Sequence, residues 1–437
     1  MKKSYLFSAF AAGMVMLSAC SNDGDLTGGN NSDDAVQQIV LQVANAGDGL
    51  QTRAGRPLYS SEAKQTIENV KVFICDASGK IVKVESYSKW NTDDSKTYGG
   101  AGKGHGRERV ITYTGDAKLT NGTYTIYAYG FHTGSSYTDL ENKISNLAVG
   151  GTLDKNIILE CNAVGEEIFA GSTTQFTIDD KNKGFYQTVV LNRQVSGTFG
   201  YFESIPCIAG ATKLELVASN PNKSLVLGGF NSFDLPSNGT GNDGHVNYVV
   251  NGTTASENKV IYTINLNEWF NDINKDDNHD GLIDAGSNWH KPANTTGAKF
   301  KTGSVFGGSF LIPFQKNENK TFVLKLVNDK GESLREWAVK LPSGDGQLSE
   351  YSLSYWNATA PKPDFASKNV TDLADKYSVV RNHLYGIGER ALDEPENPDK
   401  PDPSNPDPDK PEPLNKKQEL TLHVNDNWEI IHKMELE

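Results

Sequence analysis

Residues 418 to 437 alternate between apolar and polar side chains, and this period of two is the feature that most constrains what the chain can fold into. The even positions carry Leu420, Leu422, Val424, Trp428, Ile430, Met434 and Leu436, interrupted only by Asp426 and His432. Side chains two residues apart share one face of an extended chain, so the alternation predicts a β-strand. A lone strand leaves its backbone groups unpaired and its apolar face uncovered, and it must therefore dock on a sheet.

The segment before this strand decides how far away that sheet can be. Residues 393 to 417 combine Pro with Asp, Glu and Asn, a composition that favours solvated polyproline II or extended coil. At about 3.1 Å per residue such a linker spans roughly 75 Å, which is enough to leave its own domain. The sequence therefore leaves two interpretations open. The terminal strand folds back onto its own sheet, or it docks on another molecule.

The N-terminus has the pattern of an export signal. Lys2 and Lys3 are followed by a mostly apolar run from residue 5 to 16 and by the sequence LSAC, which ends at Cys20. The run is too short to span a bilayer as a permanent helix, which agrees with a cleaved signal in residues 1 to 20. LSAC resembles a bacterial lipobox, in which the cysteine is lipidated and becomes the mature N-terminus. The alternative is an ordinary signal peptide with a chance cysteine.

Short alternating segments recur along the chain between its two ends. In VKVFICDASGKIVKV, Val70, Val72 and Ile74 alternate before a turn, which is a hairpin signal. Similar segments include TYTIYAYGF, TKLELVAS, VIYTINL, TFVLKLV and YSLSYW, and 42 Gly, 17 Tyr and 18 Phe suit a turn-rich β protein. We predict an all-β chain with two β-sandwich domains in tandem, connected as Greek keys. The polar run DLPSNGTGNDGH places the boundary between them near residue 235.

Charge and cysteine usage exclude several classes of protein. A net charge of −13 and a pI near 5.2 argue against a nucleic-acid partner. With Cys20 assigned to lipid, Cys75, Cys161 and Cys207 remain, without any CxxC spacing. An odd number in this arrangement argues against a disulfide framework or a zinc site. We expect three buried free thiols, with a single disulfide as the alternative.

A second isolated strand precedes the first predicted domain. AVQQIVLQV puts Ile39, Leu41 and Val43 on one face of an extended segment. The chain then reads GDGLQTRAGRPL, in which Arg53 and Arg56 lie among small and polar residues typical of an exposed, protease-sensitive loop. Cleavage after either arginine would separate the strand and the lipid from everything downstream.

These features together resemble one protein family. The chain resembles the Bacteroidales fimbrillins, the type V pilins, in five features. These are the lipobox, the early strand before a Thr-Arg-Ala sequence, the two β domains, the motif KYSVVRNHLYGI at Lys376 to Ile387, and the terminal strand. The resemblance spans essentially the whole chain, and within the family it points to the minor-fimbrium fimbrillins. RNHLY is its most specific local match. The resemblance implies that the two sandwiches are transthyretin-like.

The resemblance also implies how the chain matures. In that family the subunit reaches the cell surface as an outer-membrane lipoprotein precursor, and an Arg-specific protease then removes the N-terminal strand. Carried onto this sequence, cleavage falls between Arg53 and Ala54, with Arg56 as the alternative. The released strand is residues 36 to 44, and the groove that it leaves accepts the donor strand of another subunit. The implied order is signal peptide 1–20, propeptide 21–53, domains 54–235 and 236–392, linker 393–417 and donor strand 418–437.

The implied role is that of a pilus shaft, because a shaft subunit needs both an excisable strand and a donor strand. The implied partners are other copies of the chain, accessory anchor and tip subunits, the protease and the outer membrane, and the fimbria would support adhesion and biofilm formation. Burying the apolar donor face gives a gross stabilisation on the order of 10 to 20 kcal/mol, with Trp428 as the main anchor. The alternatives are a tip subunit and a surface lipoprotein that binds glycan or protein without polymerising.

One loop has the spacing of a calcium site. DINKDDNHDGLIDAGS places side-chain oxygens at Asp276, Asn278, Asp280 and Asp284, with Gly281 at the sixth position for the tight turn. The pattern departs at the twelfth position, where a serine replaces the usual bidentate glutamate. The alternative is a plain turn rich in Asp and Asn. We expect a structural calcium ion there or none, and no other cofactor.

Catalytic motifs are missing from the sequence. It contains no GxSxG and no HExxH, and the Gly-Lys pair in YGGAGKGHGRER lacks the Ser or Thr of a phosphate-binding loop. We therefore predict no catalytic residues and no enzymatic activity. A secreted hydrolase on a β-sandwich is the remaining alternative.

Overall fold

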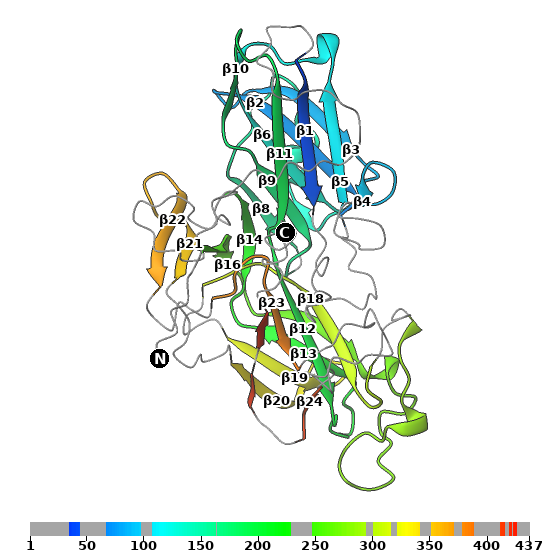
Figure 1. The fold of residues 1–437 in the computed structure, drawn as a ribbon. Helices are drawn as coiled ribbons and strands as arrows, with labels where there is room; N and C mark the ends of the chain where they lie inside the picture. Colours follow the sequence, from blue (N-terminus) through cyan, green and yellow to red (C-terminus); the bar gives the residue numbers. More distant parts are fainter. Residues whose placement is uncertain are drawn as a thin grey trace, which may run out of the picture.

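The regular secondary structure of the described residues is almost entirely β-strand. The computed structural model describes residues 35–43, 67–97, 107–162, 164–228, 247–293, 300–315, 321–340, 351–370, 378–388, 411–415, 419–421 and 423–425. Within them the helical segments are short 3₁₀ turns and one π turn, so the all-β prediction is confirmed. No helix in these ranges is long and apolar enough to cross a membrane. Figure 1 shows most strands gathered in two stacked groups, which we call the upper and lower parts.

The upper part has three layers of strands. The outer layer is β4 (Lys96–Thr97), β5 (Arg107–Tyr113), β1 (Gln37–Val43) and β11 (Phe185–Arg193). The middle layer is β3 (Ile81–Tyr87), β2 (Asn69–Asp76), β6 (Gly122–Phe131) and β9 (Ile168–Ser172), with β10 (Phe176–Ile178) beside β6. The third layer is β7 (Tyr137–Thr138), β8 (Ile157–Cys161), β14 (Asn222–Leu227) and β16 (Gly252–Ala255). Outer and middle layers are one sheet that folds over where β9 meets β11, since side chains from both share one core.

The middle layer is buried on both faces, which the sequence only half indicated. Val70, Val72 and Ile74 of β2 pack toward the outer layer, as the alternation predicts. Phe73 and Cys75 lie on the opposite face and pack against the third layer. A strand buried on both faces has no need of polar side chains between its apolar ones, which explains the nearly continuous run VFIC.

The lower part is a two-layer sandwich. One sheet contains β18 (Val305–Leu311), β12 (Ser196–Glu203), β23 (Leu384–Ile387) and β26 (His423–Asn425), with β24 (Glu412–Pro413) also on β12. The other contains β17 (Lys259–Asn265), β13 (Lys213–Ala218), β19 (Phe322–Val327), β20 (Ser333–Lys340) and β25 (Glu419–Thr421). The two sheets enclose a large shared core. A separate small sheet of β15 (Asn247–Val250), β21 (Tyr351–Asn357) and β22 (Asp364–Val370) projects to one side (Figure 1).

The chain enters the lower part earlier than we predicted. β12 and β13 pair with strands of the lower part, whereas β14 and β16 return to the upper part. The first crossing is therefore between Arg193 and Ser196, and the two parts are interleaved in sequence rather than divided at residue 235. The crossing has no turn or linker signal because β11 ends and β12 begins with only Gln194 and Val195 between them. Residue 235 itself lies outside the described residues.

Candidate strand-exchange site

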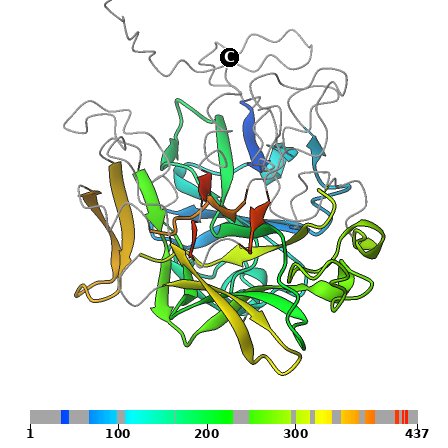
Figure 2. The same cartoon turned by 90° about the horizontal axis from the view of Figure 1, so that it is seen from below.

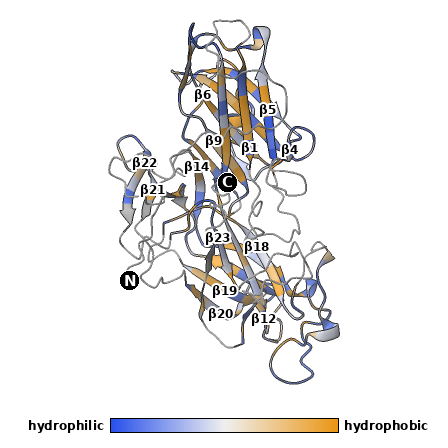
Figure 3. Cartoon of the chain, viewed as in Figure 1, coloured by the Kyte–Doolittle hydropathy of each residue, from blue (hydrophilic) through white to orange (hydrophobic). Residues whose placement is uncertain are grey.

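Strand β1 lies inside its sheet rather than at an edge. It runs parallel to β11 on one side and antiparallel to β5 on the other, and all of its residues from Gln37 to Val43 have partners on both sides. This matches the early strand expected at residues 36 to 44. Figure 3 shows β1 as a mostly hydrophobic strand beside the hydrophilic lower half of β5. Removing β1 would expose two facing strand edges with a slot between them.

The inner face of β1 is part of the core. Ile39, Leu41 and Val43 are completely buried and pack with the apolar side chains of the outer and middle layers. Val40 lies on the opposite face and is 5% exposed. Full burial of the three inner side chains gives a gross stabilisation on the order of 5 to 9 kcal/mol.

One end of the slot is polar, and the sequence did not reveal it. The Gln37 side chain is 1% exposed and faces inward with the odd-numbered residues of β1. Its Nε2 donates to the carbonyl oxygens of Leu119 at 3.0 Å and Lys183 at 2.8 Å, and its Oε1 accepts from the Leu119 N–H at 2.7 Å. We call this arrangement the carboxamide clamp. The only sequence signal was a polar residue on an otherwise apolar face.

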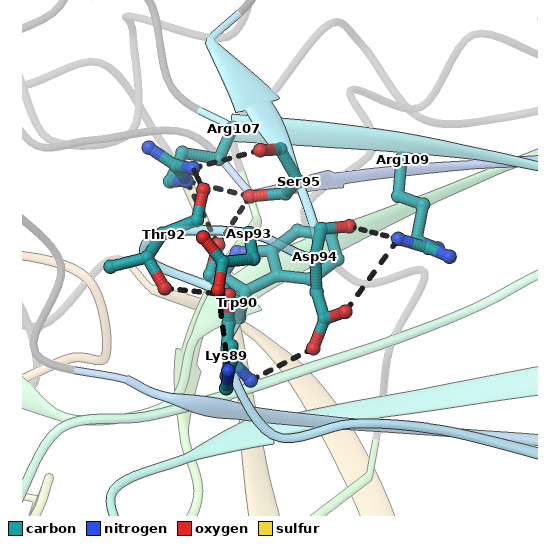
Figure 4. Close-up of polar contacts among 8 residues, drawn as sticks. All are labelled: Lys89, Trp90, Thr92, Asp93, Asp94, Ser95, Arg107 and Arg109. Atoms are coloured by element: carbon teal, nitrogen blue, oxygen red, sulfur yellow. Dashed lines mark hydrogen bonds and ion pairs between the residues drawn. The ribbon is translucent and has the colours of Figure 1, made fainter.

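The other end of the slot carries two arginines, with the carboxylates of Asp94 and Glu108 beside them. Arg107 and Arg109 are the β5 partners of Val43 and Leu41. Figure 4 shows both guanidinium groups holding the loop of residues 89–95, which covers this end of the core. Arg107 donates from Nε to the Trp90 carbonyl at 2.9 Å and from Nη2 to the carbonyls of Thr92 and Ser95. Arg109 lies 4.1 Å over the Tyr87 ring and 3.8 Å from the Asp94 carboxylate.

The first part of the predicted donor segment is docked on its own chain. β25 pairs with β20 in parallel, and β26 pairs with β23 in antiparallel fashion. Leu420 is fully buried in the lower core, and Val424 lies in β26. Seen from below, these short strands lie among the sheets of the lower part (Figure 2).

The end of the predicted linker is docked as well. β24 pairs with β12, and Leu414 is fully buried with its carbonyl accepting the Trp337 indole N–H at 3.2 Å. The sequence predicts that residues 411–415 belong to the solvated linker, because their composition continues the Pro and Glu pattern. Leu414 was the only apolar residue that marked this docking point.

Other predicted site residues lie outside the described part of the chain. These are Cys20, Arg53, Ala54, Arg56, Leu422, Trp428, Ile430, Met434 and Leu436. Lipidation, proteolytic processing and the role of the terminal residues therefore stay predictions.

The RNHLY motif forms the junction between the two parts. Arg193 Nη2 lies 2.6 Å from Glu167 Oε1, and both side chains are buried. Arg193 Nη1 also donates to Asn382 Oδ1 at 3.3 Å, and Arg381 Nη1 donates to Gln194 Oε1 at 3.0 Å. The motif thus bonds the residues at which the chain crosses from β11 to β12.

The buried pair at this junction is expected to dominate its stability. Glu167→Gln leaves the Arg193 charge buried without a counter-charge, and we expect a loss of about 3 to 5 kcal/mol in the free energy of unfolding. Glu336→Gln is the matched control, because its partner Lys325 lies 2.8 Å away on a half-exposed surface. It should cost less than about 1 kcal/mol. Urea denaturation of both variants measures the difference, and equal losses would contradict a structural role for the junction pair.

The predicted calcium loop is a folded turn. Asp276 accepts the N–H groups of Asp280 and Gly281, both at 3.0 Å, and Asp284 accepts the N–H of Asp277 at 2.8 Å. Asn278 also accepts the N–H of Asp280. Within the described residues no group of three or more His, Cys, Asp or Glu side chains is arranged to hold a metal ion. These bonds stabilise the turn without an ion, and calcium at this loop stays a prediction.

The three cysteines outside the signal are free thiols. Cys75 and Cys161 are buried, whereas Cys207 is only half-buried, so the expectation of three buried thiols holds for two of them. Burial, with a smaller effect of the neighbouring Asp76 charge, raises the pKa of Cys75 to about 12. A thiol of that pKa is inert at neutral pH, which fits a packing role.

Comparison with known proteins gives matches among solved structures. No protein-family model and no curated protein matches the chain. The fimbrial anchor protein Mfa2 from Porphyromonas gingivalis is 9% identical with a TM-score of 0.32, over 79% of this chain and 100% of that one. The tip fimbrial protein Mfa3 from the same organism, truncated at its C-terminus, is 10% identical with a TM-score of 0.33. This match covers 83% of this chain and 96% of that one. A fimbrial assembly protein from Parabacteroides distasonis is 12% identical with a TM-score of 0.32. This match covers 76% of this chain and 95% of that one. All three are described as fimbrial proteins.

Proposed function

We propose that the chain is a shaft subunit of a surface fimbria, which is exported as a lipoprotein, matured by Arg-specific proteolysis and polymerised by donor-strand exchange. The observation that carries the proposal is the position of β1, a fully paired inner strand. It is joined to the strands that follow it in the sequence through residues 44 to 66, the segment that contains Arg53 and Arg56. Cleavage there frees β1 without cutting any other described strand.

Proteolysis acts in this proposal by removing a tether. While β1 is covalently attached, its effective concentration at the slot is in the millimolar range, and a strand from another molecule competes poorly. After cleavage β1 is a separate peptide that dilutes once it dissociates. The open slot would then be an exposed apolar groove with two unpaired strand edges, which is the arrangement that strand addition satisfies.

The incoming strand is the part of the tail beyond Asn425, because residues 419–421 and 423–425 already pair within the lower part. Trp428, Ile430, Met434 and Leu436 supply its apolar face. Burying Trp428 and Ile430 in the slot is worth on the order of 3 to 6 kcal/mol of gross burial. This range overlaps the one for β1, so the tether decides which strand occupies the slot.

The positions of slot and tail favour a filament. The slot is in the upper part, and the tail leaves from β26 in the lower part (Figure 1). A contact between different surfaces of identical subunits is heterologous and does not close into a dimer. Repeated strand exchange would therefore extend the chain of subunits, which in turn would support adhesion and biofilm formation.

The experiment uses the protein from residue 21 onward, treated with an Arg-specific protease and run unboiled on a denaturing gel. The matched control is truncated after Asn425, which keeps every described strand and removes only the proposed donor. We expect a ladder of SDS-resistant oligomers from the full-length protein alone, and only after cleavage between Arg53 and Ala54 is seen by mass spectrometry. Clean cleavage with both proteins monomeric would overturn the proposal.

A second candidate function is a tip subunit or a non-polymerising surface lipoprotein that binds glycan or protein. The docking of Leu420 and Leu414 on the chain's own lower part favours it, because a tail held in cis needs no partner. In that case the full-length protein and the truncated control behave alike in the polymerisation experiment.

A further inference from the structure

The two polar residues that interrupt the donor face have the same spacing as the two ends of the slot. Asp426 and His432 are six positions apart, as are Gln37 and Val43, the first and last residues of β1. Gln37 ends in the carboxamide clamp, and Val43 lies opposite Arg107. We propose that the donor strand of a second copy lies in the slot in the direction opposite to β1, with His432 replacing Gln37 and Asp426 replacing Val43. This inference rests on the proposed strand exchange and adds its direction and register.

The clamp end of the slot selects a side chain that both donates and accepts hydrogen bonds. Once β1 leaves, the carbonyl oxygens of Leu119 and Lys183 and the N–H of Leu119 lose their Gln37 partners. A neutral imidazole carries one N–H donor and one acceptor nitrogen, so His432 can bond one carbonyl and the amide. A carboxylate has acceptors only, and Asp426 in this place would face two carbonyl oxygens.

The arginine end of the slot favours a negative charge opposite Arg107, which donates to the neutral carbonyl oxygens of Trp90, Thr92 and Ser95, whereas Arg109 already lies 3.8 Å from the Asp94 carboxylate. Arg107 and Arg109 lie on the same side of β5 as the buried residues at alternate positions after them. With the donor reversed, Asp426 takes the place opposite Arg107, and Trp428 takes the place opposite Arg109. An opposite-charge pair across two strands is stabilising, and an indole beside a guanidinium gains a cation–π contact. In the same direction as β1, His432 would lie at the arginine end and Asp426 at the clamp, so both polar contacts would be lost.

One position of the buried face keeps its residue type in the reversed strand. Ile430 replaces Ile39, which keeps an apolar side chain at the centre of the buried face. Reversal makes the donor antiparallel to β11 and parallel to β5, and both ladders satisfy the backbone groups along the slot. Met434 and Leu436 then extend beyond the clamp end of the position that β1 occupies.

Cysteine pairs on the outward face distinguish the two directions. Tyr186 and Val190 of β11 lie opposite the residues next to the two ends of β1. In the reversed register Ile431 lies opposite Tyr186 and Asn427 lies opposite Val190. If the donor instead ran in the direction of β1, Asn427 would lie opposite Tyr186 and Ile431 opposite Val190. Cβ atoms directly across two strands are about 4.5 to 5.5 Å apart, close enough for a disulfide with small adjustment.

The experiment mixes cleaved proteins in a background that starts at residue 21 and carries Cys207→Ser. We expect Tyr186→Cys with Ile431→Cys to form intersubunit disulfides on mild oxidation, and Tyr186→Cys with Asn427→Cys to form none. Val190→Cys serves as the reciprocal control, with the opposite preference. Disulfide-linked oligomers formed by Tyr186→Cys with Asn427→Cys would overturn the proposed direction of the donor but would still support strand exchange. Monomeric protein after complete cleavage overturns both, so the two failures are distinguishable.

Substitutions of His432 test the clamp separately. His432→Gln keeps a donor and an acceptor, and we expect polymerisation at nearly the normal rate. His432→Leu can make neither of the clamp hydrogen bonds, and we expect the yield of oligomers at limiting concentration to fall about tenfold. In both variants we expect the unfolding midpoint of the uncleaved protein to stay unchanged. Equal polymerisation of the two variants overturns the placement of His432 in the clamp.

Discussion

Leu41→Ala is expected to destabilise the uncleaved precursor by about 3 kcal/mol and to leave the finished filament unchanged. Leu41 is fully buried between the outer and middle layers, so truncation loses its transfer free energy and leaves a cavity. In the filament β1 is no longer present, and the substitution is therefore removed with it. The measurement compares the urea midpoint of the precursor with the temperature at which the SDS-resistant ladder dissociates.

The same substitution should accelerate release. If the whole loss falls on the bound state of β1, the strand dissociates up to about a hundredfold faster after cleavage. Gln42→Ala is the matched control, because Gln42 is on the same strand with its side chain turned outward, 3.5 Å from Glu108. It should change neither the precursor stability nor the release rate appreciably. A filament weakened by Leu41→Ala would show that β1 stays in place.

Trp428→Ala is expected to give the opposite pattern. The uncleaved precursor should keep its unfolding midpoint, because in the proposal this side chain is buried only in a neighbouring subunit. The joint between subunits should weaken by about 3 to 5 kcal/mol, which corresponds to at least a hundredfold faster dissociation. Dilution of preformed oligomers, followed over time on unboiled gels, measures the rate.

The control for this prediction is Glu429→Ala, which changes the next side chain on the opposite face of the strand. It should leave the joint within about 0.5 kcal/mol of normal. A loss of precursor stability in Trp428→Ala, with the joint unaffected, would instead place the indole on the chain's own surface. That outcome would support the non-polymerising alternative.

The strands themselves were predictable because their signal is local. Ile39, Leu41 and Val43 share a buried face as their alternation indicates, and the hairpin of β2 and β3 follows its turn residues. Two-sided burial was harder to predict, because Phe73 and Cys75 need a third layer whose strands come much later in the chain.

The polar groups of the candidate site were not predictable, because their partners are distant in sequence. Gln37 bonds Leu119 and Lys183, which are 82 and 146 positions away. The crossing into the lower part escaped detection for a different reason. Composition marks linkers, and the chain passes from Arg193 to Ser196 without one.

The direct passage from β11 into β12 has a mechanical consequence. In the proposed filament, tension enters a subunit at the slot beside β11 and leaves it through the tail of the lower part. Between the two parts it follows continuous backbone through Gln194 and Val195, and the buried Arg193–Glu167 and Arg381–Gln194 contacts hold this crossing in place. We therefore expect each subunit of such a filament to resist extension, and the segments between subunits to stretch first.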